Sequence, residues 1–222
     1  METMLAAHVQ QRLPSRKGAI RTGLYGDIIS GLQSAATDAH AVAIVIEWFD
    51  LDPRLGLRSA GSWSASAAAD IVTSSRTMLA RIRTAIAQVP AGIPIAVSLP
   101  TLPFPPLFHP AGWQAGEAEL FIRQAVLEFG AAIAARRGCA ICQSDRLATA
   151  SPCDGRYDFK SDLSIGFPYT LAHASALGDL LAQILVPPAA KKGIITDLDD
   201  TLWSGIVGEV GPEGACWDLA GH

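Results

Sequence analysis

The sequence predicts an α/β fold in which helices cover both faces of a parallel sheet. Short apolar runs alternate with stretches of helical periodicity over about residues 18–187, an order typical of strand–helix–strand units. The clearest run, residues 41–48 (AVAIVIEW), is nearly continuous in apolar and β-branched residues, as expected for a strand buried on both faces. Hydrophobic residues make up 50% of the chain, enough for a substantial core. We therefore expect a three-layer α/β domain.

The strands and helices of this domain are expected in alternating order. We place strands at residues 19–25, 41–48, 93–99 and 139–143. Helices are expected at residues 28–37, from Ser64 or Ser66 to Val89, at 113–137 and at 170–185. Pro90 and Gly92 end the second helix, and Gly138 ends the third as a C-cap.

Polar residues near two of these elements are candidates for a binding site. Glu47, Asp50 and Asp52 lie where the second strand ends, at the edge of the sheet where open α/β folds bind ligands. A solvated acidic loop is the other interpretation of these three residues. His173, near the start of the last helix, is interpreted as a capping or core residue.

Composition and charge exclude several classes of protein. The net charge is −4 and there is no basic stripe, so we expect no binding to nucleic acid. No run approaches the roughly 18 uncharged apolar residues that a membrane span needs, and the N-terminus lacks the apolar segment of a secretory signal. A cytoplasmic location with reduced thiols is expected.

Two of the four cysteines have the spacing of a redox or metal motif. Cys139 and Cys142 form a CxxC pair, but the pair falls in a short apolar run and no second CxxC occurs. We interpret both as strand residues. Cys153 and Cys216 are candidates for an acyl-carrying thiol, although no neighbouring residue would act as an activating base.

A change in composition marks a domain boundary near residue 187. Residues 186–192 (VPPAAKK) combine two prolines, small residues and two charges, as a linker does. We divide the chain into a first domain at residues 1–187, a linker at 188–192 and the beginning of a second domain at 193–222.

The second domain begins with a short apolar strand that ends in the motif Asp197-Leu198-Asp199-Asp200-Thr201. A carboxylate at the tip of a strand, here Asp197, can attack phosphorus and form an aspartyl-phosphate. A second carboxylate two residues later, Asp199, can protonate the leaving oxygen and then activate water. Thr201 can orient Asp197. Asp197 and Asp199 also supply the oxygen ligands that Mg²⁺ prefers.

The longer string GIITDLDDTLWSGIVGEVG at residues 193–211 resembles the first motif of the HAD superfamily, and within it the FkbH-like group (subfamily IIIC). The resemblance implies that Asp197 is the nucleophile, Asp199 the acid/base and Thr201 the motif threonine, followed by a flap. It also implies a Rossmann-like HAD domain whose later motifs supply the other phosphate and metal ligands. Only 25 residues follow Asp197, so we expect the chain to be truncated early in that domain and inactive alone.

The first domain resembles the SGNH hydrolases, a family with a flavodoxin-like parallel sheet. The resemblance lies in GLYGDI at the end of the first strand and in DFKSDLSIGFPYTLAHASALGDLLA near the end of the domain. Ile28 stands where the family's nucleophilic serine would follow Gly26-Asp27, and Ser161 stands where its catalytic histidine would follow Asp158. The expected asparagine after the third strand is also absent. Ester hydrolysis is therefore not expected, unless another serine serves as the nucleophile.

By resemblance, the full-length protein is expected to be a Mg²⁺-dependent phosphatase or phosphoryl-transfer enzyme. Members of the group act on a phosphorylated small molecule, such as a three-carbon acid, and load a glyceryl unit onto an acyl carrier protein in polyketide-type biosynthesis. The alternative is a non-catalytic SGNH-like module that binds a carrier protein or positions the HAD domain.

Overall fold

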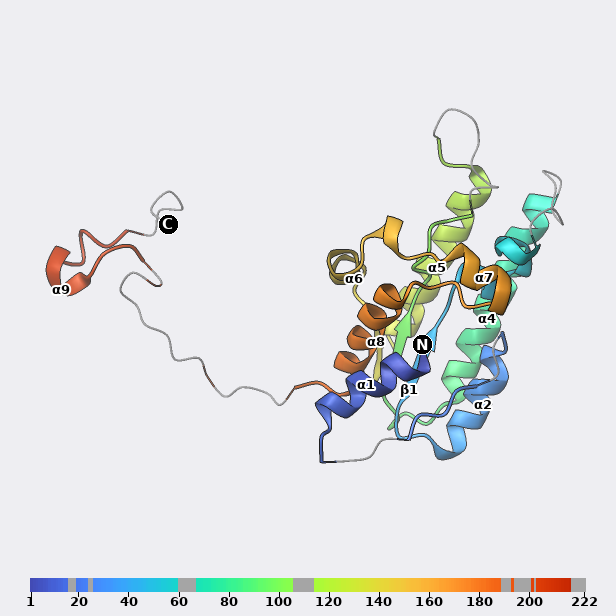
Figure 1. Cartoon of the computed structure of the whole chain (residues 1–222), viewed down its shortest axis with the longest axis horizontal. Coiled ribbons are helices and arrows are strands. Elements are labelled where there is room, and N and C mark those ends of the chain that lie inside the picture. The colour runs from blue at the N-terminus through green and yellow to red at the C-terminus, as the bar shows by residue number, and fades with distance from the viewer. Residues whose placement is uncertain are drawn as a thin grey trace. The chain divides into compact units, whose positions relative to one another are not determined.

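The chain forms two compact units, Met1–Pro187 and Pro188–His222. A computed structural model describes residues 1–15, 19–23, 26–59, 67–105, 114–188, 193, 201 and 203–216 (Figure 1). The boundary between the units falls at the Pro187-Pro188 pair, where the composition of the sequence changes.

The first unit contains three strands and several helices among the described residues. The strands are β1 (Val42–Val45), β2 (Ile95–Ser98) and β3 (Cys139–Ile141). The α-helices of this unit are α1 (Glu2–Arg12), α2 (Ile28–Asp38), α3 (Trp48–Leu51), α4 (Ala68–Gln88), α5 (Glu117–Ala134), α6 (Ser144–Ala150), α7 (Phe159–Ile165) and α8 (Leu171–Leu185). Short 3₁₀ turns cover Pro53–Leu55, Leu57–Ser59 and Cys153–Gly155.

The three strands form a parallel sheet in the order β1-β2-β3. Val42 pairs with Ile95, and Ile95 with Cys139, so the strands are in sequence order across the sheet. The fold is therefore α/β with a parallel sheet, as the alternation of apolar runs and helical stretches predicts.

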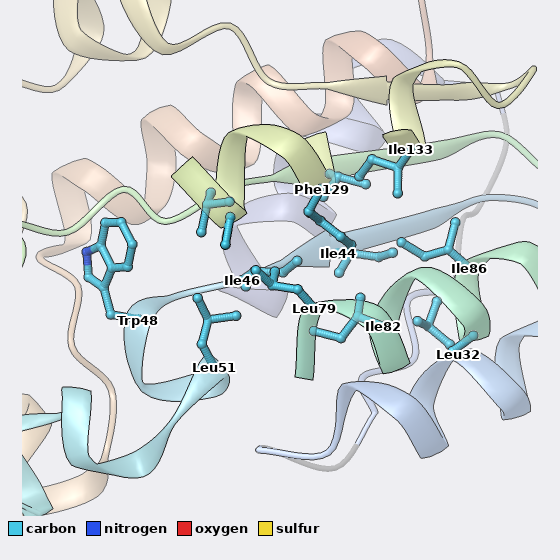
Figure 2. Packing of buried hydrophobic residues seen from close by; sticks show 14 of the residues in the cluster. Leu32, Ile44, Ile46, Trp48, Leu51, Leu79, Ile82, Ile86, Phe129 and Ile133 are labelled. Atoms are coloured by element: carbon cyan, nitrogen blue, oxygen red, sulfur yellow. The ribbon is translucent and has the colours of Figure 1, made fainter. Parts of the chain in front are cut away.

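Helices cover both faces of this sheet. On one face, Ile44 and Ile46 lie in a buried cluster with residues of α2, α4 and α5, among them Ile82 and Phe129 (Figure 2). On the other face, Ala96 lies in a second cluster with residues of α1, α6 and α8. Side chains of a strand point alternately to its two faces, and coverage of both faces explains why the sequences of β1 and β2 are almost continuously apolar. In β3, Ala140 is exposed.

Helices α2, α7 and α8 begin at side chains that accept bonds from their free main-chain N–H groups. The Asp27 side chain accepts a bond from the Ser30 N–H at the start of α2, and Thr170 Oγ1 accepts one from His173 N at the start of α8. Gly166 ends α7 at φ 77°, a left-handed conformation that favours glycine.

Two expectations for the first unit need correction. Residues 19–23 lie in no strand, and residues 24–25 are outside the described part of the chain. Arg21 instead pairs with Asp38 at 2.6 Å, and Thr22 donates to Glu2 at 3.1 Å, so side-chain bonds hold this segment against helix ends. The strand expected at residues 41–48 ends at Val45 because Glu47 and Asp50 form a capping box that starts α3.

The second unit contains a short hairpin-like segment. Ser204 and Cys216 form an isolated antiparallel bridge around α9 (Val207–Val210), with main-chain N···O distances of 2.9 and 3.1 Å. This segment coincides with the flap that the resemblance implies after Thr201.

Candidate functional site

A buried polar cluster lies at the carboxyl edge of the sheet. Its members come from the segments that follow β1 and β2 and from the region between α6 and α8. They are Glu47, Thr101, Ser151, Arg156, Tyr169 and His173, and we call them the Glu47 cluster. This is the edge of an open α/β sheet at which ligands usually bind.

Glu47 is the centre of this cluster. Glu47 is 1% exposed. Its carboxylate accepts hydrogen bonds from the main-chain N–H groups of Thr101 and Leu102, at 3.0 and 3.2 Å. The hydroxyls of Thr101 and Tyr169 also donate to it, at 2.5 and 2.9 Å. Three of these donors hold the segment after β2 against the end of β1, and Tyr169 adds the residues just before α8. The carboxylate therefore positions both segments.

His173 continues the cluster away from Glu47. The Thr101 hydroxyl donates its hydrogen bond to Glu47. Its oxygen therefore accepts a hydrogen bond from His173 Nε2, 2.9 Å away. His173 Nδ1 is then unprotonated and accepts from the Ser151 hydroxyl at 2.9 Å. The result is a chain of bonds from Ser151 through His173 and Thr101 to Glu47.

Arg156 supports the same chain of bonds from a second side. Its Nε donates to the carbonyl of Ser151 at 2.9 Å, and its Nη1 donates to the carbonyl of Thr101 at 2.7 Å. The guanidinium is itself buried. It therefore satisfies two carbonyls that would otherwise lack donors and brings a positive charge close to His173.

Burial changes the protonation of three groups here. It raises the pKa of Glu47 to about 7, although the hydrogen bonds to the carboxylate oppose the rise. Burial also raises the pKa of Asp50 to about 6, against the bond from the Glu47 N–H. Burial and the charge of Arg156 lower the pKa of His173 to about 4, so the imidazole is neutral at pH 7.

The pairing of Ser151 with a neutral imidazole resembles the start of a hydrolytic triad. However, Ser151 is 6% exposed, and Ser151, Thr101 and His173 line neither of the two cavities that stand out among the described residues. A nucleophile needs room for a substrate beside it. The geometry favours a structural role in which the cluster connects the two loops at this edge to α8.

The residues that carry the resemblance to SGNH hydrolases also have structural roles. The Asp27 carboxylate caps α2, and the Asp158 carboxylate caps α7 by accepting from the Ser161 N–H and hydroxyl, at 3.0 and 2.8 Å. Ile28, where the resemblance would place a nucleophilic serine, is the first residue of α2. These positions therefore bring no nucleophile and base together.

A cavity of about 660 Å³ lies on the outer side of β1. Residues 41–45 form one wall, and α1, α2 and the segment Arg21–Gly23 contribute the others. Asp50 and Tyr169 lie at this cavity, so one of the three acidic residues that are candidates for a pocket does line one. The other interpretation, a solvated acidic loop, is wrong for Glu47 and Asp52, which are buried. Glu47 and Asp52 do not line it; Asp52 is buried and bonded to Arg54.

The two predicted catalytic carboxylates, Asp197 and Asp199, lie outside the described residues. Thr201 is described and is exposed in a turn ahead of the Ser204–Cys216 bridge. Carboxylate oxygens fit a hard cation such as Mg²⁺, but the described residues contain no group of three His, Cys, Asp or Glu side chains that could hold a metal ion.

The four cysteines are free thiols. Burial raises the pKa of both CxxC thiols, that of Cys142 to about 11, which is the reverse of an activated redox pair. Cys153 is exposed, and Cys216 is exposed at the bridge with Ser204.

Sequence reasoning missed four members of the Glu47 cluster: Thr101, Ser151, Arg156 and Tyr169. Thr101 follows an expected strand, and that position could have identified it. Ser151 and Arg156 are separated from the preceding strand, β3, by helix α6. No local sequence pattern indicates that they belong to a site.

Comparisons with protein-family models, curated proteins and solved structures find no match. In the parts of the chain that the structure describes, no helix has the length and apolar character needed to cross a membrane.

Proposed function

We propose that this chain belongs to an enzyme that transfers phosphoryl groups through an aspartate nucleophile, of the FkbH-like kind within the HAD superfamily. The observation that carries the proposal is the string GIITDLDDTLWSGIVGEVG at residues 193–211. It begins a few residues after the boundary between the two units, where a new domain would start. An acidic turn that arose by chance would not bring with it the threonine, tryptophan and glycines that follow.

In the proposed reaction, an oxygen of Asp197 attacks phosphorus and the bond from phosphorus to the leaving oxygen breaks. Asp199 gives its proton to that oxygen. The Asp199 carboxylate then takes a proton from water, which attacks the aspartyl-phosphate, releases inorganic phosphate and restores Asp197. Mg²⁺, held by Asp197 and the main-chain carbonyl of Asp199, would neutralise the charge of the phosphate. Thr201 orients the loop.

The resemblance indicates the class of substrate and partner. We propose a phosphorylated three-carbon acid as substrate and an acyl carrier protein as the acceptor of the glyceryl unit. The first unit would then bind the carrier protein or support the phosphoryl-transfer domain. Its SGNH remnants, Asp27 and Asp158, are used as helix caps, which supports a binding role over ester hydrolysis.

The test is the release of phosphate from p-nitrophenyl phosphate and from bisphosphoglycerate in the presence of Mg²⁺. It should be run on this chain and on a form extended by about 120 residues of its gene, the length of a typical domain. Activity in the extended form should be lost in Asp197→Asn. Asp200→Asn is the matched control, since it removes a neighbouring carboxylate outside the D-x-D pair and should retain activity.

The alternative, a binding module without chemistry, predicts a different pattern. Both forms would be silent in the phosphatase assay, while an apo acyl carrier protein would shift the NMR spectrum of the first unit. Equal activity of the wild-type enzyme and Asp197→Asn would overturn the proposed nucleophile.

A further inference from the structure

The outer edge of β1 carries main-chain groups that point away from the sheet. Val42 N–H donates to the carbonyl of Pro94 and Ile46 N–H to that of Ser98, so residues 42, 44 and 46 direct their main-chain groups toward β2. In a parallel ladder the intervening residues, Ala43 and Val45, direct theirs to the opposite side. No described strand pairs with that side.

This edge is recessed between two layers of helices. Beyond β1, α1 packs on α8, which covers one face of the sheet, and α2 packs on α4, which covers the other. The cavity of about 660 Å³ lies along this edge, with residues 41–45 on one side and α1 and α2 residues around it. An exposed, uncharged strand edge is otherwise a liability that proteins protect with charge, bulges or a covering segment.

We propose that this groove binds an extended apolar segment of another polypeptide, which adds to the sheet as a fourth strand beside β1. The alternating N–H and C=O groups of Ala43 and Val45 match an extended main chain, which offers acceptors and donors at the same repeat. Both faces of the added strand would be covered by helices, so its sequence is a continuous apolar run rather than an alternating one.

The charges around the groove indicate what flanks that run. Three carboxylates, Glu2, Asp27 and Asp50, lie at the groove. Of the cations there, the Arg21 guanidinium is already paired with Asp38, and the amino group of Met1 interacts with Glu2. The carboxylates outnumber these two cations. A segment with lysine or arginine on each side of the apolar residues therefore complements the groove. The inference concerns the first unit alone and is independent of the proposed phosphoryl chemistry.

A second copy of this chain fits the groove poorly. The recess lies between α1 and α2, so an edge strand of another sheet would bring its own covering helices against them. A single strand without covering layers avoids this conflict.

The test is amide hydrogen exchange on the ¹⁵N-labelled chain with an acetylated and amidated peptide of sequence KIAVIVK. Binding should slow exchange at Ala43 and Val45 by at least tenfold. Ile44 is the internal control, because its N–H already faces β2. The same peptide with every amide nitrogen methylated keeps the apolar side chains and the lysines but has no main-chain N–H donors, and it should not bind.

Two variants of α2 locate the site. Gly31 lines the groove, and a Cβ there would meet only the Cα of Gly23 at 3.7 Å, so Gly31→Leu should fold, fill the groove and weaken peptide binding at least tenfold. Gln33 is exposed on the same helix and lines a different cavity, so Gln33→Leu should bind as the wild type does.

Three outcomes would overturn the proposal. Equal binding of the methylated peptide would mean an apolar pocket without strand pairing. Unchanged exchange at Ala43 and Val45 at saturating peptide would mean that this edge accepts no strand. A concentration-dependent dimer that protects the same two amides, and that the peptide does not dissociate, would mean that a second copy occupies the edge.

Discussion

Replacing Glu47 with glutamine should remove about 3 kcal/mol of pH dependence from the free energy of unfolding. Glu47 is buried beside two main-chain N–H groups and two hydroxyls. Burial raises its pKa from 4.5 to about 7. Glutamine has nearly the same shape but does not titrate, so the comparison isolates the ionisation of this group.

The sign follows from which state holds the proton more tightly. A folded-state pKa above the unfolded one means that the folded protein keeps the Glu47 proton up to about pH 7, while the unfolded chain releases it near pH 4.5. Ionisation therefore favours the unfolded chain, and stability decreases as the pH rises through this window. At about 1.4 kcal/mol for each pH unit between the two pKa values, the loss is about 3 kcal/mol.

The assay is urea unfolding between pH 4.5 and pH 8, followed by tryptophan fluorescence. Trp48 is buried, with its indole N–H bonded to the carbonyl of Leu102, so it reports the loss of this region. The difference in unfolding free energy between the wild type and Glu47→Gln should change by about 3 kcal/mol over the range. Glu128→Gln, at an exposed position of α5, should follow the wild type.

Parallel curves for the wild type and Glu47→Gln would refute this reasoning. They would mean that the four donors keep the carboxylate ionised throughout, and that hydrogen bonding outweighs burial. Asp50 does not confuse the comparison, because both proteins retain it and its own raised pKa of about 6 contributes equally to both curves.

Four further predictions follow from the packing and the Glu47 cluster. Arg156→Gln should raise the pKa of His173 above about 4, because the guanidinium is one of the two causes that lower it; a proton NMR titration of the imidazole measures this. Phe129→Ala should lower the free energy of unfolding by about 3–5 kcal/mol, since the ring is buried between α5 and the sheet. Gly166→Ala should cost about 1–2 kcal/mol, because the residue ends α7 at φ 77°; urea unfolding measures both losses. Ser151→Ala should hydrolyse p-nitrophenyl acetate no more slowly than the wild type, because Ser151 lines neither described cavity.

Each of these predictions has a contrary result. An unchanged pKa of His173 in Arg156→Gln would assign the shift to burial alone. A loss below 1 kcal/mol in Phe129→Ala, or no loss in Gly166→Ala, would mean that the surrounding structure adjusts more readily than its packing indicates. Ester hydrolysis that disappears in Ser151→Ala would revive the hydrolytic interpretation of the Ser151–His173 pair.

Much of the fold could be predicted because buried strands and helices have recognisable patterns of apolar residues in the local sequence. The runs at residues 41–48, 93–99 and 139–143 overlap β1, β2 and β3, since strands covered on both faces cannot alternate with polar residues. The long helices α4, α5 and α8 also lie within expected ranges, because their apolar residues recur at helical spacing. Helix α1 was not expected, and its low apolar content explains why periodicity did not indicate it.

The candidate site was less accessible to sequence reasoning. Glu47 was noted because it follows a strand, but its complete burial was not expected of a carboxylate in an acidic segment. Its partners Thr101 and Tyr169, and His173 beyond Thr101, lie far from it in the chain. Only the parallel pairing of β1 with β2, and the packing of α8 across them, brings these groups together.

Local sequence was therefore sufficient for the parallel α/β class, for the boundary near Pro187 and for the proposal of phosphoryl chemistry at Asp197. These depend on periodicity, composition and short spacing, which neighbouring residues carry. The burial of Glu47, the neutral imidazole of His173 and the edge of β1 with which no described strand pairs depended on long-range packing. A residue's own sequence context does not specify which distant donors surround it, or whether another strand lies beside its main chain.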